Sequence, residues 1–267
     1  IKDISRNPNV RLDNYFSNTL TNTVKPFDQE KTGTCWLQAG LTALCICAQK
    51  HSIKFRPSVT YLMFFDKLEK AGVFMTRFLQ DDIHQDNNIR LKTLLLDNPI
   101  NDGGTWSMFE HLITTYGIVD ENSFPETFQA KNTYYLNYVI NQYLRMNATK
   151  FHRDNIEIHL GKILEILLKS LSTPPTVVSM NLSSNGLHFS GTPLAFFREL
   201  YFDFNDYVSL IHAPNKSKKP YCTFPSNDAS NLRQHIFYSV ELTELKAICA
   251  ATIEQDLPVW FTANVSG

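Results

Sequence analysis

The 267-residue sequence predicts an α+β fold in which helices fill the first two thirds of the chain and strands come late. Apolar residues at spacings of three and four, such as Leu37, Leu41 and Leu44, have the period of one helix face. Proline and glycine interrupt these segments at turn and cap positions. Short runs rich in β-branched and aromatic residues, typical of strands, occur only beyond residue 207. A chain of this length can bury a full hydrophobic core.

Each expected element has a local reason. Residues 1–34 are polar and weakly patterned, so we expect loop or extended chain, and residues 81–88 form a second polar break. Ser58 is the type of residue that caps a helix start, and Gly117 the type that follows a helix end. Pro174-Pro175 closes the longest late helix. The sequence predicts helices over 36–51, 58–68, 89–96, 107–116, 134–146, 156–171, after Pro193 and over 243–254, and strands over 208–211, 236–240 and 259–265.

Composition excludes several classes of function. The formal net charge is −1, which argues against a generally nucleic-acid-binding surface, and we read the basic cluster at 216–219 as a solvated loop. No apolar run approaches the roughly 20 residues that span a bilayer. The five cysteines are odd in number, and Cys45 and Cys47 cannot share a helix face. We therefore expect no disulfide framework, a reducing compartment and a cytoplasmic location, with no metal or cofactor.

The most informative stretch is Gly33-Thr34-Cys35-Trp36-Leu37, with Gln29 six residues before the cysteine. It places a thiol where a polar loop gives way to an apolar helix. The positive end of the helix dipole and the unpaired N–H groups there favour the nucleophilic thiolate. A side-chain amide just upstream can donate to an oxyanion when a carbonyl is attacked. The alternative is a buried cysteine that opens a core helix.

The sequence resembles papain-like cysteine peptidases, and within them the bleomycin hydrolase and aminopeptidase C family, over about residues 26–267. The resemblance is carried by the order and spacing of several motifs, each weak alone. They are Gln29 with 33–37, the helix 58–70, Asn101-Asp102-Gly103-Gly104-Thr105-Trp106-Ser107-Met108, 116–119 with 124–126, 191–193, 207–211 with 213–214, and 258–261.

The resemblance implies roles at matching positions only. Cys35 is the expected nucleophile, and Gln29 the oxyanion donor that works with the Cys35 backbone N–H. The substrate backbone is expected to lie on Gly103 and Gly104, flanked by Asp102 and Trp106, because residues without a Cβ allow close approach. A plain turn is the alternative for Gly103-Gly104, and we interpret Trp106, like Trp36, as a packing residue more than a determinant of specificity.

Two positions depart from the family pattern. Thr34 stands where the family has Arg, and Gln38 stands where it has an aromatic residue. A loop position accepts Thr, whereas a buried Gln on the nucleophile helix needs a hydrogen-bond partner. These departures put full activity in doubt.

A thiol peptidase also needs a histidine and an Asn or Asp. His188 is the histidine nearest the papain-like spacing, but its surroundings lack the expected motif, so we do not assign it as the base. We expect the chain to be the N-terminal part of a longer protein whose β-rich His/Asn lobe is largely missing here. The expected domains are 1–128 (N-terminal segment and helical lobe with Cys35), 129–255 (helical insertion) and 256–267 (first strand of the β-rich lobe).

The sequence thus favours the N-terminal portion of a cytosolic cysteine aminopeptidase that removes N-terminal residues from peptides through an acyl-enzyme. The resemblance implies a homohexamer, or a second chain carrying the rest of the fold, and no membrane or nucleic-acid partner. The alternative is an inactive papain-like scaffold that serves as a structural or binding subunit. On either hypothesis, the chain by itself is expected to be inactive, because its catalytic His and Asn lie elsewhere.

Overall fold

The computed structural model describes residues 15–80, 89–182, 188–212, 221–223 and 236–262. The predicted polar break at 81–88 lies outside the described residues. The α-helices are α1 (Cys35–Gln49), α2 (Val59–Phe78), α3 (Ile89–Asp97), α4 (Trp106–Tyr116), α5 (Phe128–Lys131), α6 (Tyr134–Asn147), α7 (Ile156–Leu171), α8 (Pro193–Arg198) and α9 (Leu242–Glu254). The strands are β1 (Val178–Asn181), β2 (His188–Gly191), β3 (Ser209–Ile211), β4 (Tyr221–Thr223) and β5 (Ile236–Ser239).

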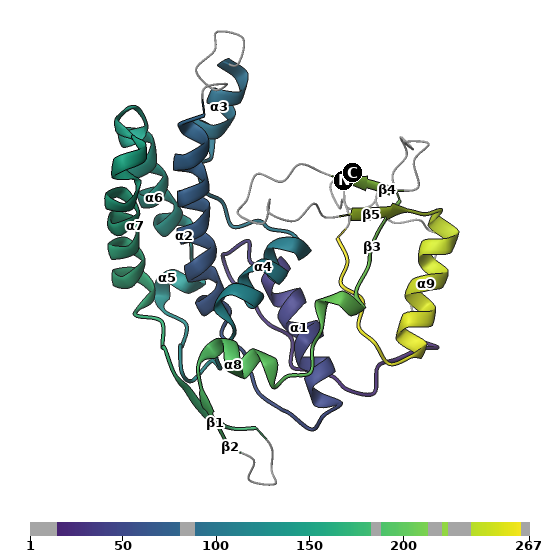
Figure 1. Cartoon of the computed structure of the whole chain (residues 1–267). Coiled ribbons are helices and arrows are strands. Elements are labelled where there is room, and N and C mark those ends of the chain that lie inside the picture. Colours follow the sequence, from purple (N-terminus) through teal and green to yellow (C-terminus); the bar gives the residue numbers. More distant parts are fainter. Residues whose placement is uncertain (1–14, 81–88, 183–187, 213–220, 224–235, 263–267) are drawn as a thin grey trace.

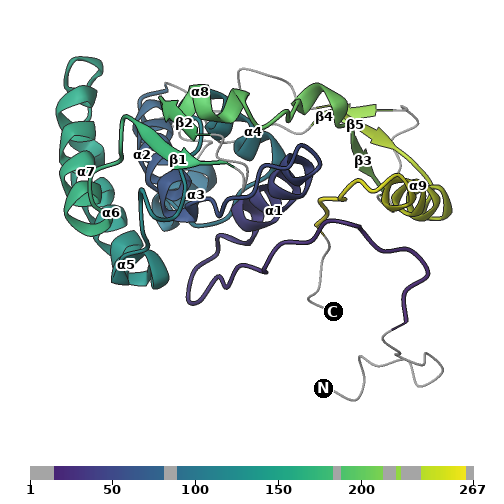
Figure 2. The ribbon, with the colours of Figure 1, turned by 90° about the horizontal axis from the view of Figure 1, so that it is seen from below.

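The helices form the body of the molecule and the strands lie at its margins. Helices α2, α6 and α7 lie side by side at one end, and α9 lies with β3, β4 and β5 at the other, with α1 and α4 between them (Figures 1 and 2). Strands β1 and β2 form an antiparallel hairpin. In the second sheet the order is β3-β5-β4, with β3 parallel and β4 antiparallel to β5.

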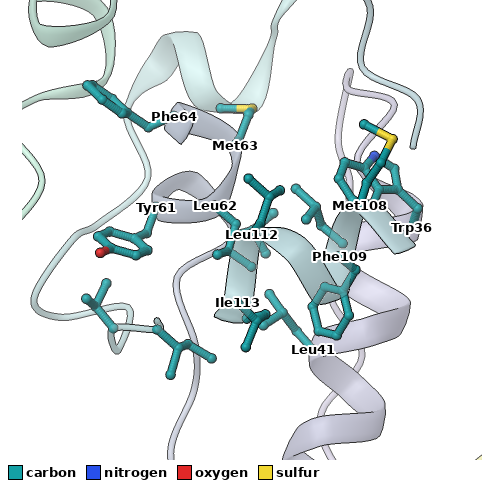
Figure 3. Packing of buried hydrophobic residues seen from close by; sticks show 14 of the residues in the cluster. Trp36, Leu41, Tyr61, Leu62, Met63, Phe64, Met108, Phe109, Leu112 and Ile113 are labelled. Atoms are coloured by element: carbon teal, nitrogen blue, oxygen red, sulfur yellow. The ribbon is translucent and has the colours of Figure 1, made fainter. Parts of the chain in front are cut away.

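The core that positions the site is formed by α1, α2 and α4. Side chains from these three helices meet in one cluster (Figure 3). Leu37, Leu41 and Leu44 are all fully buried, which confirms the predicted helix face. At Gly40 an added Cβ would lie 2.7 Å from the Phe109 ring, so α1 and α4 approach closely there. This contact holds the start of α1 against α4.

The predicted caps are present. The Ser58 hydroxyl accepts from the Tyr61 backbone N–H (3.2 Å) at the start of α2 and donates to the Phe124 carbonyl (2.6 Å). Gly117 ends α4 with φ of 74°, and an added Cβ would lie 2.2 Å from the backbone of Leu194. Only glycine fits this position, because it tolerates both the left-handed conformation and the close backbone.

The sequence located α1, α4, α6, α7 and α9 to within a few residues at their ends, but the helix predicted over 58–68 continues to Phe78 as α2, so its end was predicted ten residues too early. The strands predicted over 208–211 and 236–240 are also confirmed, as β3 and β5. The strand predicted over 259–265 is wrong for 259–262, which are irregular, and 263–265 lie outside the described residues. In the described part of the chain this segment pairs with no other strand, and the Trp260 indole N–H instead donates to the Trp36 carbonyl (3.3 Å).

Among the α-helices and strands of the described residues, four were not predicted: the short helix α5, strands β1 and β2 of the hairpin, and strand β4. Each has only three or four residues. Within the described ranges, no helix has the length and apolar character needed to cross a bilayer.

Candidate active site

Cys35 is the first residue of α1 and is exposed. The helix begins there because the Thr34 carbonyl accepts from the Gln38 backbone N–H (3.1 Å), the first bond of the helical ladder. Cys45, further along the same helix, is buried, and burial raises the pKa of its thiol to about 12. The thiol at the helix start is therefore accessible, unlike a core cysteine.

Thr34 and Gln38, the two residues that depart from the family pattern, form a hydrogen bond with each other. Both side chains are buried, and the Gln38 amide donates to the Thr34 hydroxyl (3.2 Å). The Thr34 hydroxyl also lies 2.8 Å from that of Thr32, and it makes no cap bond to the helix. The buried Gln thus has the partner that its position demands. The helix start is satisfied locally, and the Thr34 side chain leaves the first helical N–H groups uncapped.

Gln29 lies in the turn that leads to Cys35. Its backbone carbonyl accepts from the Thr32 N–H (3.0 Å) and the Thr32 hydroxyl (2.6 Å), and the residue is exposed. The loop is tied down where the Lys31 N–H donates to the Lys131 carbonyl (3.0 Å). Gln29 thus lies in a fixed turn six residues before Cys35. Its role as an oxyanion donor stays a prediction.

The Gly103-Gly104 segment lies against α1 and α2. Lys70 of α2 donates to the Gly103 carbonyl (2.7 Å) and to the Asn101 carbonyl (3.0 Å). At Gly104 an added Cβ would lie only 2.3 Å from the Trp36 indole, so the absence of a side chain permits this packing. The substrate-binding role of the segment stays a prediction, and the structure adds a packing requirement at Gly104.

The Asp102 side chain contacts other residues of this chain. The carboxylate forms an ion pair with Lys67 and accepts from the Thr133 hydroxyl (2.6 Å), the Asn137 amide (2.8 Å) and the Gly33 backbone N–H (3.2 Å). Burial acts to raise the pKa of Asp102, but the Lys67 charge and these hydrogen bonds outweigh it and lower the pKa to about 2. Asp102 is therefore a fixed anion at the junction of α2, α6 and the loop before Cys35.

Trp106 is buried at the start of α4 in an aromatic cluster. Its ring centroid lies 5.2 to 5.8 Å from those of its neighbours, which are Phe109, Phe204, Tyr207 and Trp260. These separations are typical of packed aromatic pairs. The position agrees with our interpretation of Trp106 as a packing residue.

Within the described residues, no hydrogen bond or ion pair joins a histidine to Cys35. The histidines that the structure describes have other surroundings. His51 stacks on Tyr201, His111 bonds Glu69, His152 begins a 3₁₀ turn, His159 bonds Tyr143, His188 bonds Ser179 and Asn181, and His212 lies 3.2 Å from the Val240 carbonyl. His188, on the β1–β2 hairpin, is thus not brought to the thiol.

Sequence reasoning missed the cationic residues beneath the glycines, Lys67 and Lys70. Both lie in α2, and Lys67 is fully buried, with its ammonium 2.8 Å from the Asn101 carbonyl. The available signal was the charged group Asp66-Lys67 inside an apolar helix, followed at helical spacing by Lys70. Buried charges of this kind indicate a specific partner.

Comparison with known proteins defines the class to which this fold and site belong. A profile of the peptidase C1-like family matches residues 2–267. The chain belongs to this family of papain-like peptidases, and the peptidase fold is supported by a solved structure. The crystal structure of pepw from Lactobacillus rhamnosis HN001 superposes with a TM-score of 0.80 at 27% identity, covering 92% of this chain and 59% of that one.

The similar curated proteins are named aminopeptidase C and bleomycin hydrolase. Aminopeptidase C of Listeria innocua is 30% identical over 291 residues, covering 99% of this chain and 64% of the relative. Bleomycin hydrolase of Gallus gallus is 27% identical (90% of this chain, 58% of the relative), and that of Homo sapiens 25% identical (96% and 62%). The predicted family is confirmed, and the chain spans a little under two thirds of the length of these relatives.

Proposed function

We propose that this chain is the nucleophile-bearing part of a cysteine aminopeptidase that removes N-terminal residues from peptides. One observation carries the proposal: Cys35 is exposed at the start of α1, and the ring of the next residue, Trp36, packs against Gly104. The Gly103-Gly104 segment is therefore packed against the residue that follows the thiol. The relatives named aminopeptidase C support the choice of an aminopeptidase.

The proposed reaction proceeds through an acyl-enzyme. The Cys35 thiolate attacks the scissile carbonyl, and the oxyanion is held by the Cys35 backbone N–H and the Gln29 amide. The leaving amine takes a proton from a histidine, and water then releases the acyl group. We place that histidine and its orienting Asn in a β-rich lobe outside this chain, so residues 1–267 alone are proposed to be inactive.

The remaining features of the function are proposals of the same kind. Peptides are the proposed substrates, with neither a membrane nor a nucleic acid as partner. The proposed assembly is a cytoplasmic homohexamer, or a complex with a second chain that carries the rest of the fold. The second candidate function is an inactive scaffold, and it is favoured by the departures of Thr34 and Gln38 from the family pattern.

Substitution of Gln29 tests the enzymatic proposal. In the whole protein, Gln29→Ala should lower kcat by about 10²–10³ with little change in KM, because one oxyanion donor acts only in the transition state. Gln49→Ala is the matched control: Gln49 is the last residue of α1, and among the described residues its side-chain amide donates only to the Thr23 carbonyl (3.4 Å). Equal kcat values for the two variants would remove Gln29 from the mechanism.

Activity with and without the remaining sequence separates enzyme from scaffold. The whole protein should hydrolyse amino-acid arylamides, and Cys35→Ala should abolish turnover. Residues 1–267 alone should be inactive and should regain turnover when the remaining segment is added, because a serine peptidase without triad members keeps only about 10³–10⁴ over water. A whole protein that shows no cysteine-dependent turnover would support the scaffold.

A further inference from the structure

Asp102 holds the chain on both sides of the nucleophile. Its carboxylate accepts from the backbone N–H of Gly33 (3.2 Å), two residues before Cys35. Its backbone carbonyl accepts from the indole N–H of Trp36 (2.7 Å), the residue directly after Cys35. One residue therefore fixes the chain before and after the thiol, and it is also the residue that precedes Gly103.

Lys67 holds Asp102 in turn. The Lys67 ammonium is fully buried, pairs with the Asp102 carboxylate and donates to the Asn101 carbonyl (2.8 Å). A buried ion pair is an inefficient source of stability, because apolar residues of the same volume often stabilise a fold as well or better. The ion pair instead fixes the orientation of the Asp102 carboxylate, because two charges and their hydrogen bonds define a unique geometry.

The other partners of the carboxylate come from α6. The Thr133 hydroxyl, on the residue just before α6, donates to Asp102 (2.6 Å), and so does the Asn137 amide in the first turn of that helix (2.8 Å). The carboxylate is thus fixed from α2 and from α6, and its remaining contact is with the loop that carries Cys35. Movement of Asp102 relative to either helix would displace that loop.

We propose that Asp102, oriented by Lys67, is a positioning residue that sets the distance between the Cys35 thiol and the Gly103-Gly104 segment on which a peptide backbone lies. The inference rests on the proposed function, because it concerns a peptide at that site. On this proposal the Asp102 carboxylate does not contact the substrate. It acts by holding the residues before and after Cys35 in place.

The proposal separates two kinds of reagent. A small alkylating agent needs only the thiol, whereas a peptide-shaped reagent needs the thiol and the glycine segment in register. A misplacement of 1 Å can reduce a reaction that depends on such register by about 10²-fold. Loss of Asp102 should therefore slow the peptide-shaped reagent specifically.

The experiment compares two reagents on the whole protein. The rate constants for alkylation of Cys35 by iodoacetamide and by a peptidyl chloromethyl ketone are measured by peptide mass mapping. The test variants are Asp102→Asn and the double variant Asp102→Asn/Lys67→Met, which leaves no lone buried ammonium. Asp120→Asn is the matched control, because Asp120 is also buried and its carboxylate holds a turn through Asn122 and Ser123.

We expect the ratio of the ketone rate to the iodoacetamide rate to fall by about 10–10²-fold in both Asp102 variants and to stay at the wild-type value in Asp120→Asn. A purely structural role is recognised at buried Cys45: partial unfolding would raise iodoacetamide labelling of Cys45, whereas a positioning role lowers the ketone rate at Cys35 and leaves iodoacetamide labelling of Cys45 at the wild-type value. If Asp102→Asn does not fold, the double variant decides.

Two contrary results have different meanings. A wild-type protein in which the peptidyl ketone has no advantage over iodoacetamide would overturn the proposed function, and this inference with it. A wild-type preference that persists unchanged in both Asp102 variants would overturn the positioning role alone and leave the peptidase proposal intact.

Discussion

Substitution of Gly104 by alanine tests the packing of the glycine segment on the nucleophile helix. The new Cβ would lie 2.3 to 2.5 Å from three atoms of the Trp36 indole. Carbon atoms in contact are normally about 3.5–4.0 Å apart, so roughly 1–1.7 Å of separation must be opened. Trp36 is 4% exposed, and its indole is held by a hydrogen bond to the Asp102 carbonyl (2.7 Å), so the ring has little freedom to move aside.

Overpacking of a filled site costs about 1–3 kcal/mol. We expect Gly104→Ala to lower the free energy of unfolding by that amount, as measured by urea denaturation followed by far-ultraviolet circular dichroism. Gly103→Ala is the matched control, because its Cβ would meet only the Asn101 side-chain oxygen at 3.4 Å, an ordinary contact. That variant should stay within about 0.5 kcal/mol of the wild type.

A second substitution tests whether the Trp36 ring causes the loss of stability in Gly104→Ala. Trp36→Phe shortens the ring next to Gly104, so it should cost less in the Gly104→Ala background than in the wild type. The double-mutant cycle should show a coupling energy of about 0.5–3 kcal/mol. Equal stabilities of Gly103→Ala and Gly104→Ala, or a coupling energy of zero, would refute the close approach of Gly104 to Trp36.

Three further results are expected. A thiol reagent at neutral pH should modify exposed Cys35 before buried Cys45, and mass mapping that shows equal rates would contradict an accessible nucleophile. Ser58→Ala should lower the free energy of unfolding by about 1–2 kcal/mol in urea titrations, since it removes both the helix cap and the bond to the Phe124 carbonyl. The pKa of Asp102 is lowered from 3.8 to about 2, so its stabilising contribution should be complete above the higher value and lost as the pH falls between the two. Thermal unfolding of Asp102→Asn should lack this part of the acid dependence, and identical acid profiles for variant and wild type would contradict it.

The fold was predictable where a local pattern sufficed. Helices α4 and α7 carry apolar periodicity and are followed by Gly117 and by Pro174-Pro175, and these signals depend on neighbouring residues alone. The hairpin β1–β2 carries no such signal, because its four-residue strands are stabilised by pairing with each other and their faces alternate only weakly. Strand 259–265 was expected from composition, but composition cannot supply a partner strand.

The sequence motif of the site was predictable, but the residues that hold the motif in place were not. Cys35, Gln29 and the glycines stand out by spacing and by resemblance. The partners of Asp102 are separated from it by 31 to 69 residues, so sequence order does not reveal that they converge on one carboxylate. Sequence order also did not reveal that the two positions that depart from the family motif, Thr34 and Gln38, form a hydrogen bond with each other.

The bond between Trp260 and Trp36 bears on the order in which the protein is assembled during synthesis. The two residues are 224 positions apart, and a second pair of contacts, from Asn18 to Glu254 and from Thr21 to Asp256, spans a similar separation. Contacts between such distant segments form late, after the ribosome has released both partners. Helix α1 can fold early, but the Trp36 carbonyl gains this hydrogen bond only after Trp260 has been synthesised. Cys35 is exposed in the folded chain as well, so its thiol is open to oxidation both during synthesis and after folding.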